Sequence, residues 1–217
     1  MGLLLVWAVD LWAPRQDLPW KPLLLADPPG LATGVKFARA AADPETCRDI
    51  LRDGGVEFVA EPDRTQGFCT TLNAVRLTGG VTRLSPAAPV MTCKAALAYA
   101  FWERHAVQPA AAAVLGQGVA RIEHFGTYAC RNVYGRSEGR PSEHAFSNAV
   151  DVAAFRLADG RRISVVGDFR DEGAEGAFLR RVRDGACPWF KGVLSPDYNA
   201  AHRDHFHLDY GRYDICR

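Results

Sequence analysis

Hydrophobic and polar positions along the chain first indicate a set of helices. Apolar side chains recur at helical spacing over residues 89–108 and form a wide stripe there, and the alanine-rich stretch 110–115 is also expected to be helical. Residues 44–51 predict a further helix, because Asp43 is a good cap and proline is favoured at a first helical position. Residues 174–184 predict another, with its apolar side chains on one side.

Alternating patterns indicate short strands between and after these helices. The expected strands are 56–59, 74–77, 122–130, 150–157, 162–166 and 205–210. Asp159-Gly160 is a strong two-residue hairpin turn between two of them. Residues 11–35 are rich in proline and tryptophan and predict an extended lead-in rather than a helix. The order of these elements along the chain, with helices first and hairpins later, indicates a single α+β domain with a largely antiparallel sheet.

Composition limits the class of protein. The chain has 217 residues, of which 48% are hydrophobic and 24% charged, which fits one ordinary soluble domain with a real core. Its formal net charge of +1 argues against a nucleic-acid partner that would be held by phosphate neutralisation.

The start of the chain is apolar but short. Residues 2–9 are hydrophobic, Asp10 interrupts them, and no basic residue precedes them. A spanning helix needs about 20 apolar residues, and a signal peptide has a positive first region. We expect residues 1–18 to be a lead segment, either the remnant of a membrane anchor or signal or a packing arm. Residues 19–217 are expected to form the domain.

The six cysteines are spread through the chain, and none forms a CxxC pair. In an oxidising compartment they can pair in fifteen ways. Short loops are the easier closures, which favours Cys47–Cys69, Cys93–Cys130 and Cys187–Cys216. The alternative is that they are reduced, buried small apolar residues.

Two short blocks carry the candidate chemistry. The first, 142–151, contains His144 and Asp151, and the second, 202–209, contains three more of the six histidines. On a strand His205 and His207 point to the same face, with Asp204 on the other. His144 and Asp151 are seven apart, so they converge only if His144 lies in the loop before the strand that carries Asp151.

Two imidazoles and a carboxylate that leave one position for water are typical of a hydrolytic zinc site. A general base is still needed to take the proton of that water. His105 and His124 are interpreted as ordinary core or surface histidines, which most histidines are. An HxH pair by itself is weak evidence; the combination of both blocks carries more weight.

Several stretches resemble known bacterial proteins. His144-x6-Asp151 followed by His205-x-His207 resembles the ligand pattern of the LAS metallopeptidases, a group with D-Ala-D-Ala carboxypeptidases and murein endopeptidases. More closely, the chain resembles the bacterial extensin-like C-terminal domain family over most of residues 19–217. The stretches that carry this resemblance are 19–23, 93–97, 127–131, 142–145, 151–155 and 204–209.

The LAS resemblance implies zinc on a small antiparallel sheet with helices packed on one side. It implies that His144, Asp151 and His207 are the metal ligands. For the general base it offers His205 first, then Asp204, which stands where one branch has glutamate, and then His202.

Two further residues are candidates for contacting the substrate. Arg131, in a stretch that loosely resembles a substrate-binding arginine motif, could hold a carboxylate or an oxyanion; a surface salt bridge is the alternative. Ser142 either hydrogen-bonds substrate or shapes the loop before His144.

The resemblance implies a zinc-dependent peptidase that cuts peptide bonds of bacterial cell-wall peptidoglycan, in the periplasm or cell envelope. Its partners would be stem or cross-link peptides, with membrane association through the N-terminus if that is an anchor. A non-catalytic zinc-bearing module that binds the envelope is the main alternative, and structural histidines without any metal are a third.

Overall fold

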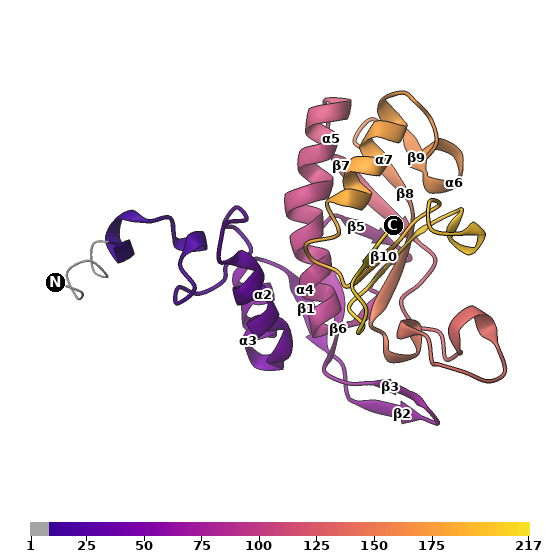
Figure 1. Ribbon diagram of the computed structural model, residues 1–217, viewed down its shortest axis with the longest axis horizontal. Helices are drawn as coiled ribbons and strands as arrows, with labels where there is room; N and C mark the ends of the chain where they lie inside the picture. Colours follow the sequence, from indigo (N-terminus) through magenta and orange to yellow (C-terminus); the bar gives the residue numbers. More distant parts are fainter. Residues whose placement is uncertain (1–8) are drawn as a thin grey trace.

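A computed structural model describes residues 9–217, and its centre is a seven-stranded sheet (Figure 1). The strand order is β12-β10-β11-β8-β7-β5, with β9 also paired to β8. The strands are β5 (Arg83–Ser85), β7 (Val119–His124), β8 (Ala149–Leu157), β9 (Arg162–Ser164), β10 (Gly192–Leu194), β11 (Phe206–Asp209) and β12 (Ile215–Cys216). Within this sheet β5–β7 and β10–β12 are parallel and the other pairings are antiparallel. The expected α+β domain with a largely antiparallel sheet is confirmed.

Two smaller sheets are built from strands within residues 57–92, a stretch that also contains β5 of the large sheet. A three-stranded antiparallel sheet has the order β1-β4-β6, and β2 and β3 form a hairpin. Their bounds are β1 (Glu57–Ala60), β2 (Arg64–Gln66), β3 (Cys69–Thr71), β4 (Ala74–Gly79) and β6 (Val90–Thr92). The strands expected at 56–59 and 74–77 are therefore present as β1 and β4.

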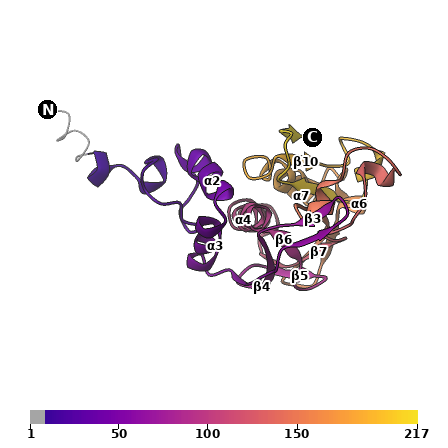
Figure 2. The same cartoon turned by 90° about the horizontal axis from the view of Figure 1, so that it is seen from below.

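The helices are α2 (Thr33–Ala42), α3 (Pro44–Asp53), α4 (Cys93–Trp102), α5 (Gln108–Leu115), α6 (Val165–Asp168) and α7 (Ala174–Asp184). Helices α4 and α7 pack on β8 of the large sheet, and α2 and α3 pack on α4. Figure 2 shows α4 between α2 and α3 on one side and the strands on the other. The predictions for α3 and α7 are confirmed, and the Asp43 side chain accepts a hydrogen bond from the Thr46 amide at 3.3 Å, as a cap should.

The expected helix 89–108 differs from the structure at both ends. Residues 90–92 form strand β6, and the hydroxyl of Thr92 then caps α4 by accepting from the Ala95 amide. At the other end α4 runs into α5 through a π-helical turn, η2 (Glu103–Val107). Pro109 stands two residues after this turn, and because proline lacks the N–H that a helix interior needs, a local change of hydrogen bonding is expected there.

A bulge in β8 decides which side chains face the helices. Val152 pairs with His124 and Ala154 with Glu123, which leaves Ala153 without a partner. Before the bulge the even positions, such as Val152, are in the core; after it the odd positions are, such as Phe155. Phe155 packs on Phe178 of α7 with ring centroids 5.2 Å apart. The opposite face of the sheet is thereby left for Asp151.

Three local expectations were wrong. The lead-in 11–35 is not wholly extended, because residues 9–12 are helical, η1 (Arg15–Asp17) is a 3-10 turn, and α2 begins at Thr33. The strand 122–130 ends at His124, where the chain turns away through Gly126 at φ 142°. The strand 162–166 ends at Ser164, whose side chain caps α6 by accepting from the Gly167 amide.

Two of the three expected disulfides were wrong as well. The pairs are Cys47–Cys93, Cys69–Cys130 and Cys187–Cys216, with Cα atoms 6.2, 5.6 and 5.8 Å apart, so only the last was predicted. Loop length was a poor guide, because doubling a loop costs only about 0.6 kcal/mol in closure entropy. Packing decides instead: Cys47 lies on α3, which packs against the first turn of α4 where Cys93 stands.

The lead segment is only partly described. Its residues 1–8 lie outside the described residues, and the division at residue 19 stays a prediction. Asp10 accepts hydrogen bonds from Trp20 and Lys21 at 2.7 Å each, so residues on the two sides of that division are in contact. Within residues 9–217 no helix is both long enough and apolar enough to cross a membrane.

The disulfide assignment gives a first test. Mass spectrometry of a non-reduced digest should find peptides joined through Cys47–Cys93 and Cys69–Cys130, and a peptide joining Cys47 to Cys69 would contradict the fold. Replacing both Cys47 and Cys93 by alanine should lower the free energy of unfolding by about 2–5 kcal/mol in a denaturant titration, because the bond closes a long loop.

Candidate metal centre

Three predicted ligands come from three separate elements and meet on the face of the sheet opposite the helices. Asp151 is on β8 and His207 on β11, and the two are direct cross-strand partners in the register. His144 lies in the 3-10 turn η4 (Glu143–Phe146), just before β8. The expectation that His144 sits in a loop preceding the strand of Asp151 is confirmed.

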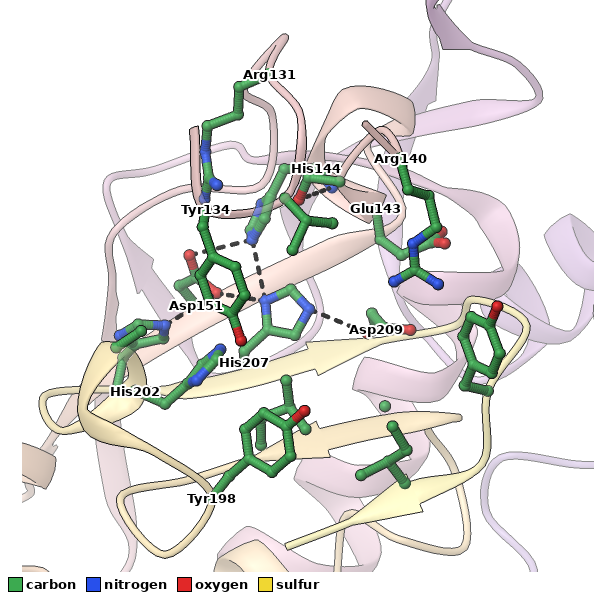
Figure 3. A pocket seen from close by; sticks show the side chains of 18 of the residues that line it. Arg131, Tyr134, Arg140, Glu143, His144, Asp151, Tyr198, His202, His207 and Asp209 are labelled. Carbon is green, nitrogen blue, oxygen red and sulfur yellow. Dashed lines mark hydrogen bonds and ion pairs between the residues drawn. The ribbon is translucent and has the colours of Figure 1, made fainter. Parts of the chain in front are cut away.

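The ligand atoms converge closely, and Figure 3 shows the three side chains pointing toward one another. His144 Nε2 is 3.1 Å from Asp151 Oδ2 and 3.2 Å from His207 Nδ1. His207 Nδ1 is 2.9 Å from Asp151 Oδ1. All three ligand atoms lie within 4.8 Å of one another, so they could hold one metal ion. Two deprotonated imidazole nitrogens at 3.2 Å would repel through their lone pairs, so a cation or a proton belongs between them.

The turn that carries His144 is held by local hydrogen bonds. Ser142 caps it, with its Oγ accepting from the His144 amide at 3.4 Å, and the Ala129 amide donates to the His144 carbonyl at 3.1 Å. Ser142 is buried as well as lining the cleft. Of its two suggested roles, the one that shapes the loop has a contact in the structure.

A fourth residue, Asp209, orients His207 from behind. Its Oδ2 accepts from His207 Nε2 at 3.0 Å, and its Oδ1 accepts from the Gly211 amide at 2.7 Å. A Cβ atom on Gly192 would lie 2.1 Å from Asp209 Oδ2, so glycine is needed there to make room. This leaves His207 Nδ1 for a metal, in the carboxylate–histidine arrangement common at metal sites. Residue roles assigned from the sequence omitted Asp209, although strand parity places it on the same face as His205 and His207.

The charges in this cluster are strongly coupled. Burial opposes ionisation of Asp151, but hydrogen bonds from His144 and His207 outweigh it and lower the Asp151 pKa far below its usual range. Burial alone would lower the pKa of His207, yet its hydrogen bonds to Asp151 and Asp209 raise that pKa to about 9. Without a metal the cluster is therefore an ion pair that holds a proton on His207.

His205 and Asp204 form a dyad beside the candidate ligands. Asp204 Oδ1 is 2.9 Å from His205 Nδ1, and His205 Nε2 is 3.5 Å from Asp151 Oδ1. His205 therefore presents Nε2 to the cluster while Asp204 lies behind it and is more exposed. Asp204 precedes β11, so strand parity does not constrain it.

His202, the third candidate base, lies in the 3-10 turn η5 (Ala200–His202) and stacks loosely near His205 and His207, with ring centroids 5.3 and 5.8 Å away. Its Nδ1 is 2.8 Å from Asn199 Oδ1. Burial, then repulsion from His207 and His205, lowers its pKa to about 4, so it is neutral near pH 7.

The two histidines interpreted as ordinary ones are not part of the candidate metal group among the described residues. His105 Nε2 is 2.9 Å from the Leu25 carbonyl oxygen, and His124 Nε2 is 2.8 Å from that of Pro86. Each is within hydrogen-bond distance of the backbone, as that interpretation expects.

The cluster opens into a cleft of about 410 Å³. Arg131 lines it, and in Figure 3 its side chain extends from its loop toward the cleft. Sequence reasoning gave no role to other lining residues, which come from the stretches 134–143 and 198–213: Tyr134, Arg140, Glu143, Tyr198, Arg212 and Tyr213. No spacing in the sequence brings the two stretches together, because they meet only in the fold.

Comparison with known proteins identifies one family. A family model described as "Extensin-like protein C-terminus" matches residues 45–217, which is most of the chain. No curated protein and no solved structure matches the chain significantly. Together with three disulfides, which form in oxidising compartments, the family suggests an extracellular or envelope location. By the extent of that match, the chain belongs to the extensin-like protein C-terminus family.

Proposed function

We propose that this protein is a zinc-dependent peptidase that hydrolyses peptide bonds of bacterial cell-wall peptidoglycan in the periplasm or envelope. The observation that carries the proposal is the convergence of His144 Nε2, Asp151 and His207 Nδ1 at the floor of a cleft, with His205 beside them. The spacing of these residues resembles that of the LAS metallopeptidases, and we propose a relationship to that group.

The donor set supports zinc as the metal. Two imidazoles and one carboxylate match three-ligand zinc sites, which keep a fourth position for water or substrate. The hydrogen bond of His207 to Asp209 fixes the imidazole so that Nδ1 faces the site. When bound in such a site, zinc supplies Lewis acidity that activates water and polarises a carbonyl.

The chain's own residues supply proton transfer and binding. His205 can take a proton at Nε2, because its Nδ1 is held by Asp204. The same proton can then pass to the leaving amine. Arg131, exposed at the edge of the cleft, is placed to bind a substrate carboxylate or the oxygen of the scissile carbonyl.

One observation favours a second function, a non-catalytic zinc-bearing module of the envelope. His205 Nε2 is only 3.5 Å from Asp151 Oδ1, so His205 could serve as a fourth ligand and close the site. Closed four-ligand sites are structural rather than catalytic. Mass spectrometry of sacculi digested with and without a chelator separates the two: released muropeptides that disappear with the chelator support the peptidase, and none in either case supports the module.

Two variants separate metal ligand from base. His207→Ala should lose both bound zinc, measured by elemental analysis, and muropeptide release from sacculi. His205→Ala should keep its zinc while hydrolysis falls by about 10²–10⁴-fold, the usual contribution of a general base. Undiminished release by His207→Ala would refute the proposal, and loss of zinc in His205→Ala would favour the closed site.

Asp209→Asn tests the support behind His207. An amide cannot accept the His207 proton with the same strength, so zinc affinity should fall by about 10–100-fold in a chelator competition. Asp214→Asn is the matched control, since Asp214 is a nearby exposed carboxylate that pairs with Lys191. Equal affinities of the two variants would show that Asp209 does not support the ligand.

Zinc binding should depend on pH through His207. The raised pKa of about 9 means that the metal-free protein keeps this proton at pH 7, and a ligand nitrogen must lose it. Calorimetry in buffers of different ionisation enthalpy should show about one proton released per zinc at pH 7, falling toward zero above pH 9. In the metal-free protein the raised pKa stabilises the fold fully below the ordinary histidine pKa near 6.5, and this contribution disappears as pH rises through 9. No proton release at pH 7 would contradict a ligand role for His207.

A further inference from the structure

Three arginines line the cleft without acidic partners. Arg131, Arg140 and Arg212 are exposed, and among the described residues none of their guanidinium groups has a hydrogen bond or ion pair. The carboxylates of the same cleft are otherwise engaged. Asp151 and Asp209 contact His207, and the third carboxylate, Glu143, accepts a hydrogen bond from Asn148 at 2.8 Å. A divalent cation at the metal centre would therefore leave the cleft with a positive excess, which suits an anionic ligand.

Arg140 is the best positioned of the three. Its guanidinium carbon lies 4.7 Å from the ring centroid of Tyr213, within the range of a cation–π contact. Figure 3 shows its side chain extending from the loop toward the cleft. Stacking holds the guanidinium in one plane while leaving its N–H edge free, and a planar pair of donors matches the two oxygens of a carboxylate.

The loop that carries Arg140 is fixed at its base. The Val133 amide donates to the Arg140 carbonyl at 2.9 Å, and the Ser142 amide donates to the Arg131 carbonyl at 3.0 Å. Inside the loop, Asn132 donates to the carbonyls of residues 136 and 137. Cys130, next to Arg131, is joined to Cys69 of β3. The base of the loop therefore does not have to order when a ligand binds, which lowers the entropy cost of binding.

The opposite wall, with Tyr213, is also fixed. The turn that carries it follows β11, where the Gly211 amide donates to Asp209. After the turn, the Ile215 amide donates to the Lys191 carbonyl at 2.8 Å, and Cys216 is joined to Cys187. The same Asp209 that orients His207 thus holds the start of this turn, which ties the wall to the metal centre.

We propose that Arg140, stacked on Tyr213 and assisted by Arg212, forms a subsite for a free carboxylate of the substrate. The inference rests on the proposed peptidase function and adds a substrate class: wall peptides that carry an unamidated carboxylate close to the scissile bond. Arg140 is then a specificity-determining residue. Arg131, on the other strand of the same loop base, is left to contact the scissile peptide.

The test compares two forms of one ligand. Soluble muropeptides, released from sacculi by a muramidase, are used with their carboxylates free or chemically converted to carboxamides. Calorimetry measures their binding to the zinc-loaded protein. The free acids should bind about 10–100-fold more tightly, the range expected for a charge-assisted, paired hydrogen bond. Arg140→Gln should lose this preference while its affinity for the carboxamides stays unchanged.

Two further variants make the test specific. Arg140→Lys keeps the charge but loses the planar pair of donors, so it should recover only part of the preference. Arg181→Gln removes one exposed charge from α7, away from the cleft, and should keep the whole preference. Zinc content and melting temperature of each variant should match those of the unchanged protein.

Each outcome has a defined meaning. Equal binding of acids and carboxamides, no binding of either, or the same loss in Arg181→Gln would overturn the subsite. Hydrolysis is followed separately by mass spectrometry of the products. If binding is selective and depends on Arg140 but no product forms, the subsite is supported and the peptidase is refuted. If the protein hydrolyses the muropeptides but shows no preference for the free acids, the peptidase is supported and the subsite is refuted.

Discussion

The pairing of His207 with Asp151 across β11 and β8 is the contact on which the candidate site depends. The same register places Phe206 opposite Val152 on the other face, in the core beneath the helices. Because side chains alternate along a strand, a slip of one residue would bury the histidine and expose the phenylalanine. The apolar face of the sheet therefore fixes the register of the polar face. Burial of Phe206 and its neighbours sets the strand alignment in which the His207 imidazole and the Asp151 carboxylate can share one ion.

The other parts of the site are attached to this pair by covalent and backbone constraints. His144 arrives on a turn capped by Ser142, and the loop before it is joined to β3 through Cys130. Asp209 reaches His207 because Gly192 leaves room for its carboxylate. These constraints act on the loop before His144 and on the strand pair β10–β11, as expected for a site whose geometry must be held before a ligand arrives.

Local patterns in the sequence were enough to predict α3, α7 and a hairpin at Asp159-Gly160, although its loop is longer than the expected two residues. They also predicted the shared face of His205 and His207, which both approach Asp151 Oδ1. These local patterns failed where contacts between residues distant in the sequence determine the structure. The bulge at Ala153 reverses the parity of β8, and no alternation pattern shows it. The Cys47–Cys93 disulfide follows how α3 packs on α4 rather than loop length. The cleft walls, Arg140 and Tyr213, lie more than seventy residues apart and meet only once the sheet has formed.

The cluster itself is a poor source of stability, which is an argument for its being functional. Burying charged groups carries a desolvation cost that their mutual attraction offsets only in part. The core under α4 and α7 lies on the other face of the sheet and does not include these charged groups. Yet the chain places two histidines and a carboxylate there, leaves a further imidazole beside them, and opens the group to a cleft. Positions that break the local rules of packing in this way are expected where a ligand has to be bound.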